Sequence, residues 1–178
     1  GALGMANDIP TVLRAAARLH DNKKIRFLFV GDGKERPHLE KLAQEMKLSN
    51  VIFIGSRPKT DMPKILAASN ACLAILMDIP MFRTTYPNKV FDYMAAEKPT
   101  ILAIDGVIRQ VLEAAGGGLF VHPGDDKALS AAVLKMSSNT EQSKKIGLAA
   151  RDYVVKHFNR NDQAKEFVTL VNRIAKKW

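Results

Sequence analysis

The sequence predicts an α/β fold built on a doubly wound parallel sheet, and three observations support this prediction. Short apolar runs of strand length alternate with longer segments whose apolar residues recur at helical spacing. The short runs are apolar throughout, as expected for parallel strands that helices cover on both faces. The chain has 178 residues and no internal repeat, which suits one domain with one core. We therefore predict a single domain over residues 1–178.

The first half of the chain is predicted to contain three helices and three strands. β-branched and aromatic residues favour the strands, and Gly31 and Gly55 end two of them. In chain order the predicted elements are a helix over Ile9–Leu19, a strand over Ile25–Val30, a helix carrying Leu39, Leu42, Ala43 and Met46, a strand over Val51–Gly55, a helix over Met62–Ala68 and a strand over Ala71–Leu76.

The second half continues the alternation with a helix that begins at Pro87. The proline suits the first helical position, and Val90, Phe91, Met94 and Ala95 form the apolar stripe. The predicted elements that follow are a strand over Pro99–Ile104, a helix over Val107–Ala115, a strand over Leu119–Val121, and helices over Asp126–Met136, Glu141–His157 and Asp162–Lys177.

Composition and charge exclude several classes of function. The net charge of +9, from 27 Lys and Arg against 18 Asp and Glu, favours an anionic partner. Because there is no Arg-rich run and no interleaving of basic with aromatic residues, we predict no binding to nucleic acid. No apolar run approaches the roughly 20 residues of a membrane-spanning helix, and no signal peptide is visible. These features predict a cytoplasmic protein.

Metal and thiol chemistry are not expected either. The four histidines lie far apart and lack carboxylates at ligand spacing, so no metal site is predicted. The single cysteine, Cys72, excludes an intramolecular disulfide. Because Cys72 lies inside an apolar run, we predict a small buried hydrophobic side chain rather than a nucleophile.

The turn Gly31-Asp32-Gly33 follows a predicted strand, and ligands of such sheets bind at the carboxyl ends of the strands. It matches part of a dinucleotide fingerprint, but Arg36 occupies the position of the third glycine. Two interpretations stay open. One is a simple turn with Gly33 at positive φ, and the other is an anion site that uses Lys34 or Arg36.

A second turn, Gly55-Ser56-Arg57, also follows a predicted strand. Its backbone could contact the edge of a nucleobase, and Arg57 could reach a phosphate or stack on a ring. The alternative is a surface arginine beside the rigid turn at Pro58.

The segment from Thr84 to Pro99 is the richest candidate for a binding site. The first N–H groups of a helix lack intrahelical acceptors and attract anions. Asp92 lies one turn into this helix, where its carboxylate could accept two hydrogen bonds from a ribose. The alternative is a capped helix with an exposed Lys89–Asp92 ion pair. The donors that gather at the helix start are Thr84, Thr85, Asn88 and Lys89.

Four motifs in order resemble a known family. They are F-L-F-V-G-D-G-K-E-R-P-H-L-E, V-I-F-I-G-S, Y-P-N-K-V-F-D-Y-M-A-A-E-K-P-T-I-L-A and G-G-G-L-F-V-H-P-G-D-D-K-A-L. Together they resemble the carboxyl-terminal domain of retaining GT-B glycosyltransferases of the family-4 type, over nearly the whole chain. Within that family, P-N-K-V-F-D-Y-M-A-A-E-K-P is similar to the branch that transfers amino sugars in bacterial O-antigen and capsule synthesis.

The resemblance implies that the chain is the Rossmann-like C-terminal half of a GT-B fold and that it binds a nucleotide-sugar donor. The whole enzyme would be a hexosyltransferase in cell-surface polysaccharide or lipopolysaccharide synthesis. It gives Asp92 the donor ribose and puts Gly55, Ser56 and Arg57 near the base. UDP-sugar is favoured over GDP-sugar, and neither a metal nor another cofactor is expected. The residues that the resemblance puts near the sugar and diphosphate are Thr84, Thr85, Asn88 and Lys89.

This sequence departs from the family pattern where the diphosphate is usually held. Thr84 stands at the position of an acidic residue, and Ala2 and Asn7 stand where Arg and Lys are usual. We therefore expect Lys89, with N–H groups around Gly4 and the start of the Pro87 helix, to carry more of the anion binding.

The resemblance also implies parts that the sequence does not contain. The family's amino-terminal acceptor domain, which carries the catalytic residues, and a central strand before Gly1 are expected to be absent. A segment swapped from a second chain is an alternative occupant of that strand position. We expect the chain alone to be inactive and to act with its acceptor domain in the bacterial cytoplasm, with peripheral contact to the inner membrane.

Two alternative functions stay open. One is a GT-B-fold sugar-nucleotide epimerase, which shares this donor-binding half. The other is a non-catalytic nucleotide- or membrane-docking module, for which the terminal stretch Asn172–Trp178 supplies basic and apolar residues.

Overall fold

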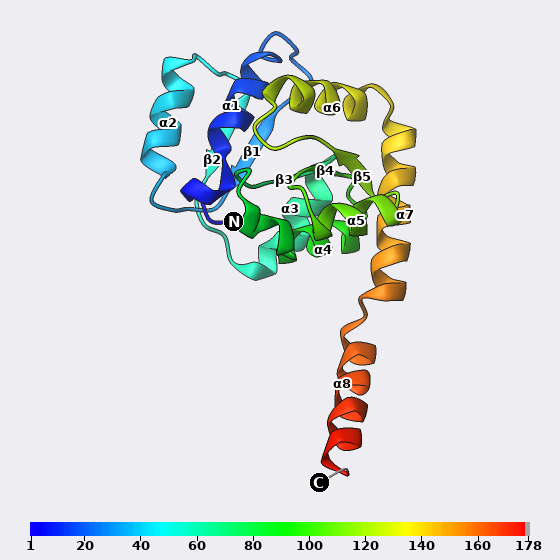
Figure 1. Cartoon of the computed structure of the whole chain (residues 1–178). Helices are drawn as coiled ribbons and strands as arrows, with labels where there is room; N and C mark the ends of the chain where they lie inside the picture. The colour runs from blue at the N-terminus through cyan, green and yellow to red at the C-terminus, as the bar shows by residue number, and fades with distance from the viewer. Residues whose placement is uncertain (177–178) are drawn as a thin grey trace.

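Five short parallel strands form the centre of the structure, a computed structural model that describes residues 1–176 (Figure 1). β1 (Phe27–Val30) pairs with β2 (Val51–Ile54), with Phe27 opposite Val51. β3 (Cys72–Ile75), β4 (Thr100–Ala103) and β5 (Gly118–Phe120) form a second sheet in that order. The α/β prediction is confirmed, but the strands form two parallel sheets rather than one continuous sheet.

Eight α-helices connect and cover the strands among the described residues. Where a range was predicted, the bounds lie within about two residues of it, and α4 begins one residue later than predicted. The helices are α1 (Ile9–Ala17), α2 (Arg36–Glu45), α3 (Met62–Ala68), α4 (Asn88–Ala95), α5 (Val107–Ala114), α6 (Asp126–Ser138), α7 (Thr140–His157) and α8 (Arg160–Ala175). The predicted extension of the last helix to Lys177 lies outside the described residues.

Three short 3-10 helices were not predicted. They are η1 (Met5–Asn7), η2 (Lys59–Asp61) and η3 (Pro80–Thr84). Three to five residues make at most two turns, so they contain no periodic apolar pattern that a sequence could show.

The core lies on both faces of the strands. On one face, Leu13 of α1, Leu39 of α2 and Leu129 of α6 pack with Phe27 and Phe29 of β1. On the other face α4, α5 and α7 cover β3 and β4. The fully buried side chains of this second cluster include Val90, Met94, Leu102, Ile104, Ile108 and Leu112. In a three-layer arrangement of this kind ligands bind at the carboxyl ends of the strands, which is where the candidate site lies.

The last helix, α8, extends away from the rest of the chain (Figure 1). It contains no buried residue. Its exposed apolar side chains are Phe167, Val168, Leu170, Val171 and Ile174. The helix is therefore held by its own hydrogen bonds and by its connection to α7 rather than by packing.

Candidate functional site

The first residues of the chain run across the carboxyl ends of β1 and β3. The Leu3 amide donates to the Asp32 carbonyl at 2.8 Å, and the Met77 amide donates to the Ala6 carbonyl at 2.9 Å. Ala2 forms an isolated parallel bridge with Asp32. The segment 1–8 is thus anchored to the loops that follow two different strands.

This close approach explains the glycines of the Gly31-Asp32-Gly33 turn. A Cβ at Gly31 would collide with the backbone of Gly1, and a Cβ at Gly33 would collide with the backbone of Leu3. Positive φ occurs at Gly31, at 140°, so the prediction that placed it at Gly33 is wrong. The turn therefore serves backbone packing, which the sequence pattern alone could not separate from a phosphate-binding turn.

Arg36 is one of the two cations proposed for an anion site in this turn, and its guanidinium is already paired with carboxylates. Its Nε donates to Glu40 Oε1 at 2.8 Å, and its Nη1 lies 3.5 Å from Asp32 Oδ2. These partners, Glu40 first, raise the pKa of Arg36. Lys34 is exposed. The structure thus favours the simple-turn interpretation over an anion site at Arg36.

The start of α4 presents two backbone amides without acceptors. Pro87 is the residue before the helix, with extended backbone (φ −68°, ψ 118°), and its carbonyl accepts from the Val90 amide at 3.0 Å. The prediction of Pro87 as the first helical residue is therefore wrong by one position. No residue in 1–176 accepts a hydrogen bond from the amides of Asn88 or Lys89. These two N–H groups are available to a ligand at the positive end of the helix dipole.

Lys89 contributes one of these two amides, and its side chain is partly buried. Its Nζ donates to Asn7 Oδ1 at 2.8 Å, and Asn7 Nδ2 donates to the Ala2 carbonyl at 2.9 Å. Burial lowers the pKa of the Lys89 ammonium. Lys89 therefore contacts a neutral amide rather than forming the alternative ion pair with Asp92.

Asp92 lies one turn further along α4 and is exposed. It belongs to none of the ion pairs formed by the described residues. Asn88 is likewise exposed beside the free amides. The carboxylate is thus accessible to a ligand that approaches the helix start.

Thr84 and Thr85 end the short helix η3 before α4. Thr84 Oγ1 donates to the Met81 carbonyl at 3.3 Å, and the Thr85 amide donates to the Phe82 carbonyl at 3.2 Å. Gly106, at φ 107°, allows η3 to lie against the start of α5, because a Cβ there would collide with the Arg83 backbone. The neighbouring loop after β4 therefore fixes the position of these threonines.

The remaining predicted residues lie in two other loops, one before η1 and one after β2. Gly4 is extended and precedes η1, where its carbonyl accepts from the Asn7 amide at 3.0 Å. Gly55 follows β2, and a Cβ there would lie 3.2 Å from Arg36 Nη1. Ser56 and Arg57 are exposed. The Asn7–Lys89 hydrogen bond brings the Gly4 loop to α4, whereas no described hydrogen bond joins the 55–57 turn to α4.

Asn7 is the residue whose part in the site sequence reasoning missed. It was interpreted as a lost cation, whereas in the structure it holds the ammonium of Lys89. The two residues are 82 positions apart, and nothing local to either position indicates the contact.

The described part of the chain offers no site for a metal ion and no exposed thiol. Across residues 1–176 there is no group of three or more His, Cys, Asp and Glu side chains arranged to hold a metal ion. Cys72 is buried, as predicted, and burial raises the pKa of its thiol to about 12, which disfavours the thiolate that a nucleophile requires. Within the same residues, no helix has the length and apolar character needed to cross a bilayer.

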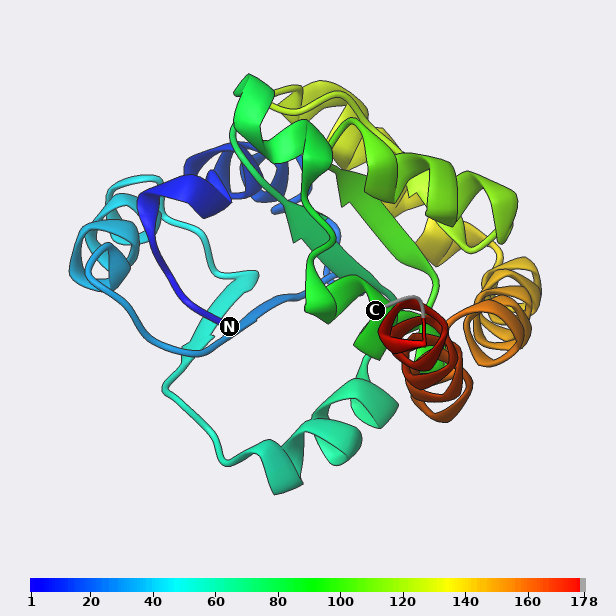
Figure 2. The same cartoon turned by 60° about the horizontal axis from the view of Figure 1, so that its bottom comes forward.

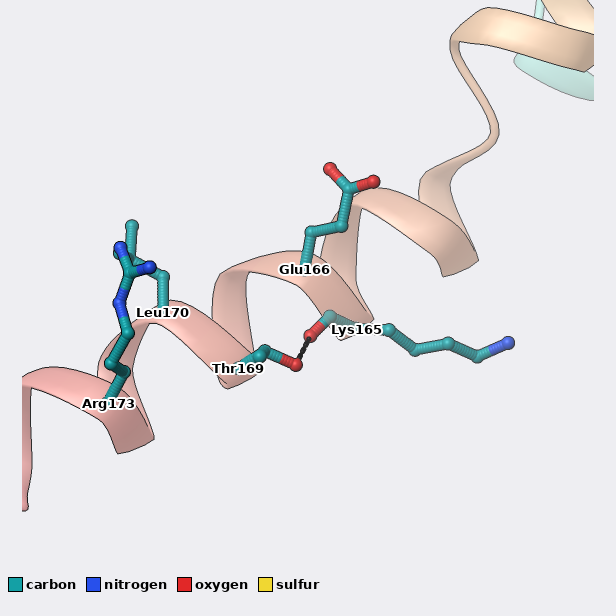
Figure 3. A pocket seen from close by; sticks show the side chains of 5 residues that line it. All are labelled: Lys165, Glu166, Thr169, Leu170 and Arg173. Carbon is teal, nitrogen blue, oxygen red and sulfur yellow. Dashed lines mark hydrogen bonds between the residues drawn. The ribbon is translucent and has the colours of Figure 1, made fainter.

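A shallow depression on α8 is not a competing site. Figure 3 shows that Lys165, Glu166, Thr169, Leu170 and Arg173 line it, all from this one helix. The hydrogen bond drawn there, from Thr169 Oγ1 to the Lys165 carbonyl at 2.8 Å, is internal to the helix. With no second element to enclose a ligand, the depression lacks the concavity of a binding pocket.

Comparisons with known proteins agree with this fold. The profile of a family described as glycosyl transferases group 1 matches residues 1–153. No curated protein matches the chain by sequence. Solved structures do match it. This chain covers less than half of the length of each of the three larger proteins compared with it.

The first of these structures is Alr3699/HepE of Anabaena in complex with UDP, with a TM-score of 0.84 at 18% identity over 97% of this chain and 47% of that chain. Sucrose-phosphate synthase from Thermosynechococcus elongatus has a TM-score of 0.86 at 22% identity over 99% and 45%. WaaG, a glycosyltransferase involved in lipopolysaccharide biosynthesis, has a TM-score of 0.70 at 20% identity over 86% and 40%. At these identities the similarity establishes the fold alone. That fold corresponds to one part of each larger protein.

Proposed function

The chain belongs to the glycosyl transferases group 1 family, and we propose that it is the donor-binding domain of a glycosyltransferase. The enzyme would transfer a sugar from a nucleoside diphosphate sugar to a glycan or to a lipid-linked acceptor. The family membership supports the reaction class, and the geometry at the start of α4 supports the donor side of it.

The partly buried ammonium of Lys89 is the observation that carries the proposal. Its hydrogen-bond partner is a neutral amide, and Lys89 also contributes one of the two free amides at the start of α4. A partly buried cation without a carboxylate is unfavourable on its own and gains most from a bound anion. A diphosphate fits this need, since it offers several oxygens to one ammonium and two N–H groups.

The other predicted residues have roles around this anion. Asp92 holds the ribose through its exposed carboxylate, and the amides near Gly4 add donors to the diphosphate. Thr84, Thr85 and Asn88 face the sugar side of the donor. The turn of Gly55, Ser56 and Arg57 contacts the base.

The same groups suit the chemistry of the transfer. Negative charge develops on the diphosphate as the bond to the sugar breaks, and Lys89 with the α4 amides stabilises that charge in place. The reaction on this side therefore needs no further cofactor, and we propose that none takes part.

We propose a UDP-sugar as the donor, with a GDP-sugar as the second choice, supported by the UDP complex of the similar HepE structure. We further propose the bacterial O-antigen or capsule amino-sugar branch as the setting, supported by the P-N-K-V-F-D-Y-M motif and by the similarity to WaaG. The catalytic residues belong to an acceptor-binding domain, so the chain alone binds donor without transferring sugar. The net charge of +9 favours association of the enzyme with the anionic cytoplasmic face of the membrane.

Isothermal titration calorimetry of the 178-residue chain with UDP, GDP and uridine tests the proposal. UDP should bind, uridine should bind at least about tenfold more weakly because it lacks the diphosphate, and Asp92→Ala should weaken UDP. The matched control is Asp152→Ala on the exposed face of α7, where affinity should not change. Equal affinity of parent and Asp92→Ala would remove the ribose assignment, and equal affinity for UDP and uridine would remove the diphosphate site.

A further inference from the structure

One edge of the β1–β2 sheet is open along β2. The Phe27 amide of β1 donates to the Asn50 carbonyl at 2.8 Å, so the backbone at residue 50 faces β1. Successive residues of a strand point their N–H and C=O groups to opposite sides, and Val51 and Phe53 therefore point theirs away from β1. No strand adjoins β2 on that side among the described residues, and β2 lies on the side of β1 away from β3 (Figure 2).

The backbone of this edge has unused hydrogen-bonding groups. Outside the β1–β2 ladder, no hydrogen bond of residues 1–176 uses the amide or the carbonyl of Val51 or Phe53. Both residues are partly exposed, so another chain can reach them. An edge of this kind is a template on which a further extended strand can pair.

A shallow depression runs beside the same edge. Glu40 of α2 and Lys47, just after α2, line it together with Val51 and Phe53. The side chains of Val51 and Phe53 therefore lie on the face of the sheet that α2 covers. Ile52 lies on the opposite face and is 44% exposed. Unlike the depression on α8, this one is formed by two elements, and it adjoins free backbone groups.

We propose that this edge is a dimerisation surface, on which β2 of a second copy of the chain pairs antiparallel about a two-fold axis at Ile52. In this register Val51 lies opposite Phe53 of the partner subunit, and the symmetric pair repeats the contact. Their backbone groups point toward the partner, so each pair exchanges both of its N–H···O bonds. The two copies then share one continuous sheet.

The side chains of β2 suit this register on both faces. On the α2 face, Val51 packs beside Phe53 of the partner subunit, and pairs of an aromatic with a β-branched residue stabilise neighbouring strands. On the other face, the two exposed Ile52 side chains lie directly opposite each other and lose contact with water. Pairing therefore buries apolar surface that a single copy leaves exposed.

The charges beside the edge select a second copy as the occupant. Because α2 connects two parallel strands, it runs opposite to β2, so Lys47 lies near the start of β2 and Glu40 lies toward its end. A two-fold axis at Ile52 exchanges these ends and brings Glu40 to Lys47 of the partner subunit. Within one copy Lys47 joins none of the ion pairs of the described residues, and Glu40 uses only Oε1, for Arg36. An unrelated strand would need the same two charges in reverse order, which a second copy supplies by symmetry.

Analytical ultracentrifugation of the 178-residue chain at one fixed, low ionic strength tests the dimer. The chain should pass reversibly from monomer to dimer between micromolar and millimolar concentration. Amide hydrogen exchange followed by NMR identifies the edge. The amides of Val51 and Phe53 should exchange at least about fivefold more slowly in concentrated than in dilute protein. The amides of Leu73 and Ile75 on β3 should not change with concentration.

Two matched pairs of variants separate this edge from the rest of the surface. Ile52→Lys places like charges opposite each other across the axis, so it should weaken dimerisation by at least about tenfold. Leu28→Lys is its control and should leave the dimer intact, because Leu28 is 45% exposed on the same face but lies on β1. Lys47→Glu should also weaken the dimer, and adding Glu40→Lys should restore it. Lys41→Glu, outside the depression, makes the same change of charge and should have no effect.

Several outcomes would overturn the proposal. A chain that stays monomeric at millimolar concentration has no such surface. Dimerisation without slower exchange at Val51 and Phe53 would assign the contact to another surface. Equal losses from Ile52→Lys and Leu28→Lys would mean that the exposed face of the sheet associates rather than its edge. A charge swap at positions 40 and 47 that fails to restore the dimer would remove the two-fold register.

Discussion

At the scale of single residues, the hydrogen bond between Lys89 and Asn7 decides how the site can treat an anion. An asparagine oxygen fixes the position of the ammonium without neutralising it. A carboxylate in the same place would neutralise it. The identity of residue 7 therefore controls whether the positive charge of Lys89 is available to a ligand.

The first prediction follows from this contact. Asn7→Asp should weaken UDP binding by at least about tenfold, since the new carboxylate pairs with Lys89 and repels the diphosphate. Asn7→Ala removes both side-chain hydrogen bonds of Asn7 without adding charge, so it should weaken binding less. Calorimetry on the two variants measures the difference, and an Asn7→Asp protein that binds as well as Asn7→Ala would show that Lys89 does not contact the anion.

The second prediction concerns the pH dependence of stability. Burial lowers the pKa of Lys89 below its usual 10.5. Between the lowered value and 10.5 the unfolded chain keeps the proton that the folded chain has released, so the free energy of unfolding rises with pH across that window. Below the window the folded chain bears the full cost of burying the charge.

Lys89→Met should therefore be more stable than the parent at pH 7, and this advantage should shrink as pH rises toward 10.5. Urea unfolding at a series of pH values measures it. Lys64→Met, on an exposed position of α3, is the matched control that sets the baseline for losing a lysine charge. An advantage of Lys89→Met that is the same at every pH would contradict the assigned burial of the charge.

At the scale of elements, the attachment of segment 1–8 to the turn after β1 is the contact on which the site geometry depends. Gly33→Ala should loosen this segment and weaken UDP binding, because a Cβ would displace the Leu3 backbone. Gly116→Ala is the matched control. It sits at φ 56° with open space around its Cβ position, so it should cost roughly 1 kcal/mol of stability and leave UDP affinity unchanged. Calorimetry and urea unfolding separate the two effects.

Most elements could be predicted from the sequence because their apolar patterns are strong. Strands such as Val51–Ile54 are apolar runs bounded by turn residues, and helices such as Ile9–Ala17 have a clear buried face. The start of α4 was misplaced by one residue because proline fixes φ but leaves ψ free, and here ψ is extended at Pro87. The prediction of positive φ at Gly33 rather than Gly31 fails because both glycines lie against a neighbouring backbone, and a G-x-G pattern does not show which of the two adopts positive φ.

The geometry of the candidate site was predictable only in part. The motif at the start of α4 indicated Asn88, Lys89 and Asp92, since a helix start and its first turn can be read locally. The partner of Lys89 could not be read, because it depends on how the segment 1–8 folds back across two strands. Long-range contacts of this kind come from tertiary packing, which local spacing does not encode.

At the scale of the whole molecule, α8 is separable from the rest. It buries no residue, so removal of residues 160–178 should shift the melting temperature by less than about 3 °C. Val154→Ala on α7 provides a contrast, since Val154 is 6% exposed and packs in the core; it should destabilise by about 2 kcal/mol. Thermal unfolding followed by circular dichroism measures both, and a large loss on removing α8 would reveal packing that the structure does not contain.

Among the described residues β1 pairs only with β2 and β3 pairs only with β4, so each of these strands has one open edge, and these edges determine how the protein behaves on storage. Neither strand contains a charged residue or a proline, the features by which natural sheets discourage edge-to-edge aggregation. Mutual repulsion from the net charge of +9 then becomes the main barrier to association. Salt screens that repulsion over about 10 Å at 0.1 M. Solubility should therefore fall as salt is added, and concentrated stocks of this protein should be kept at low ionic strength.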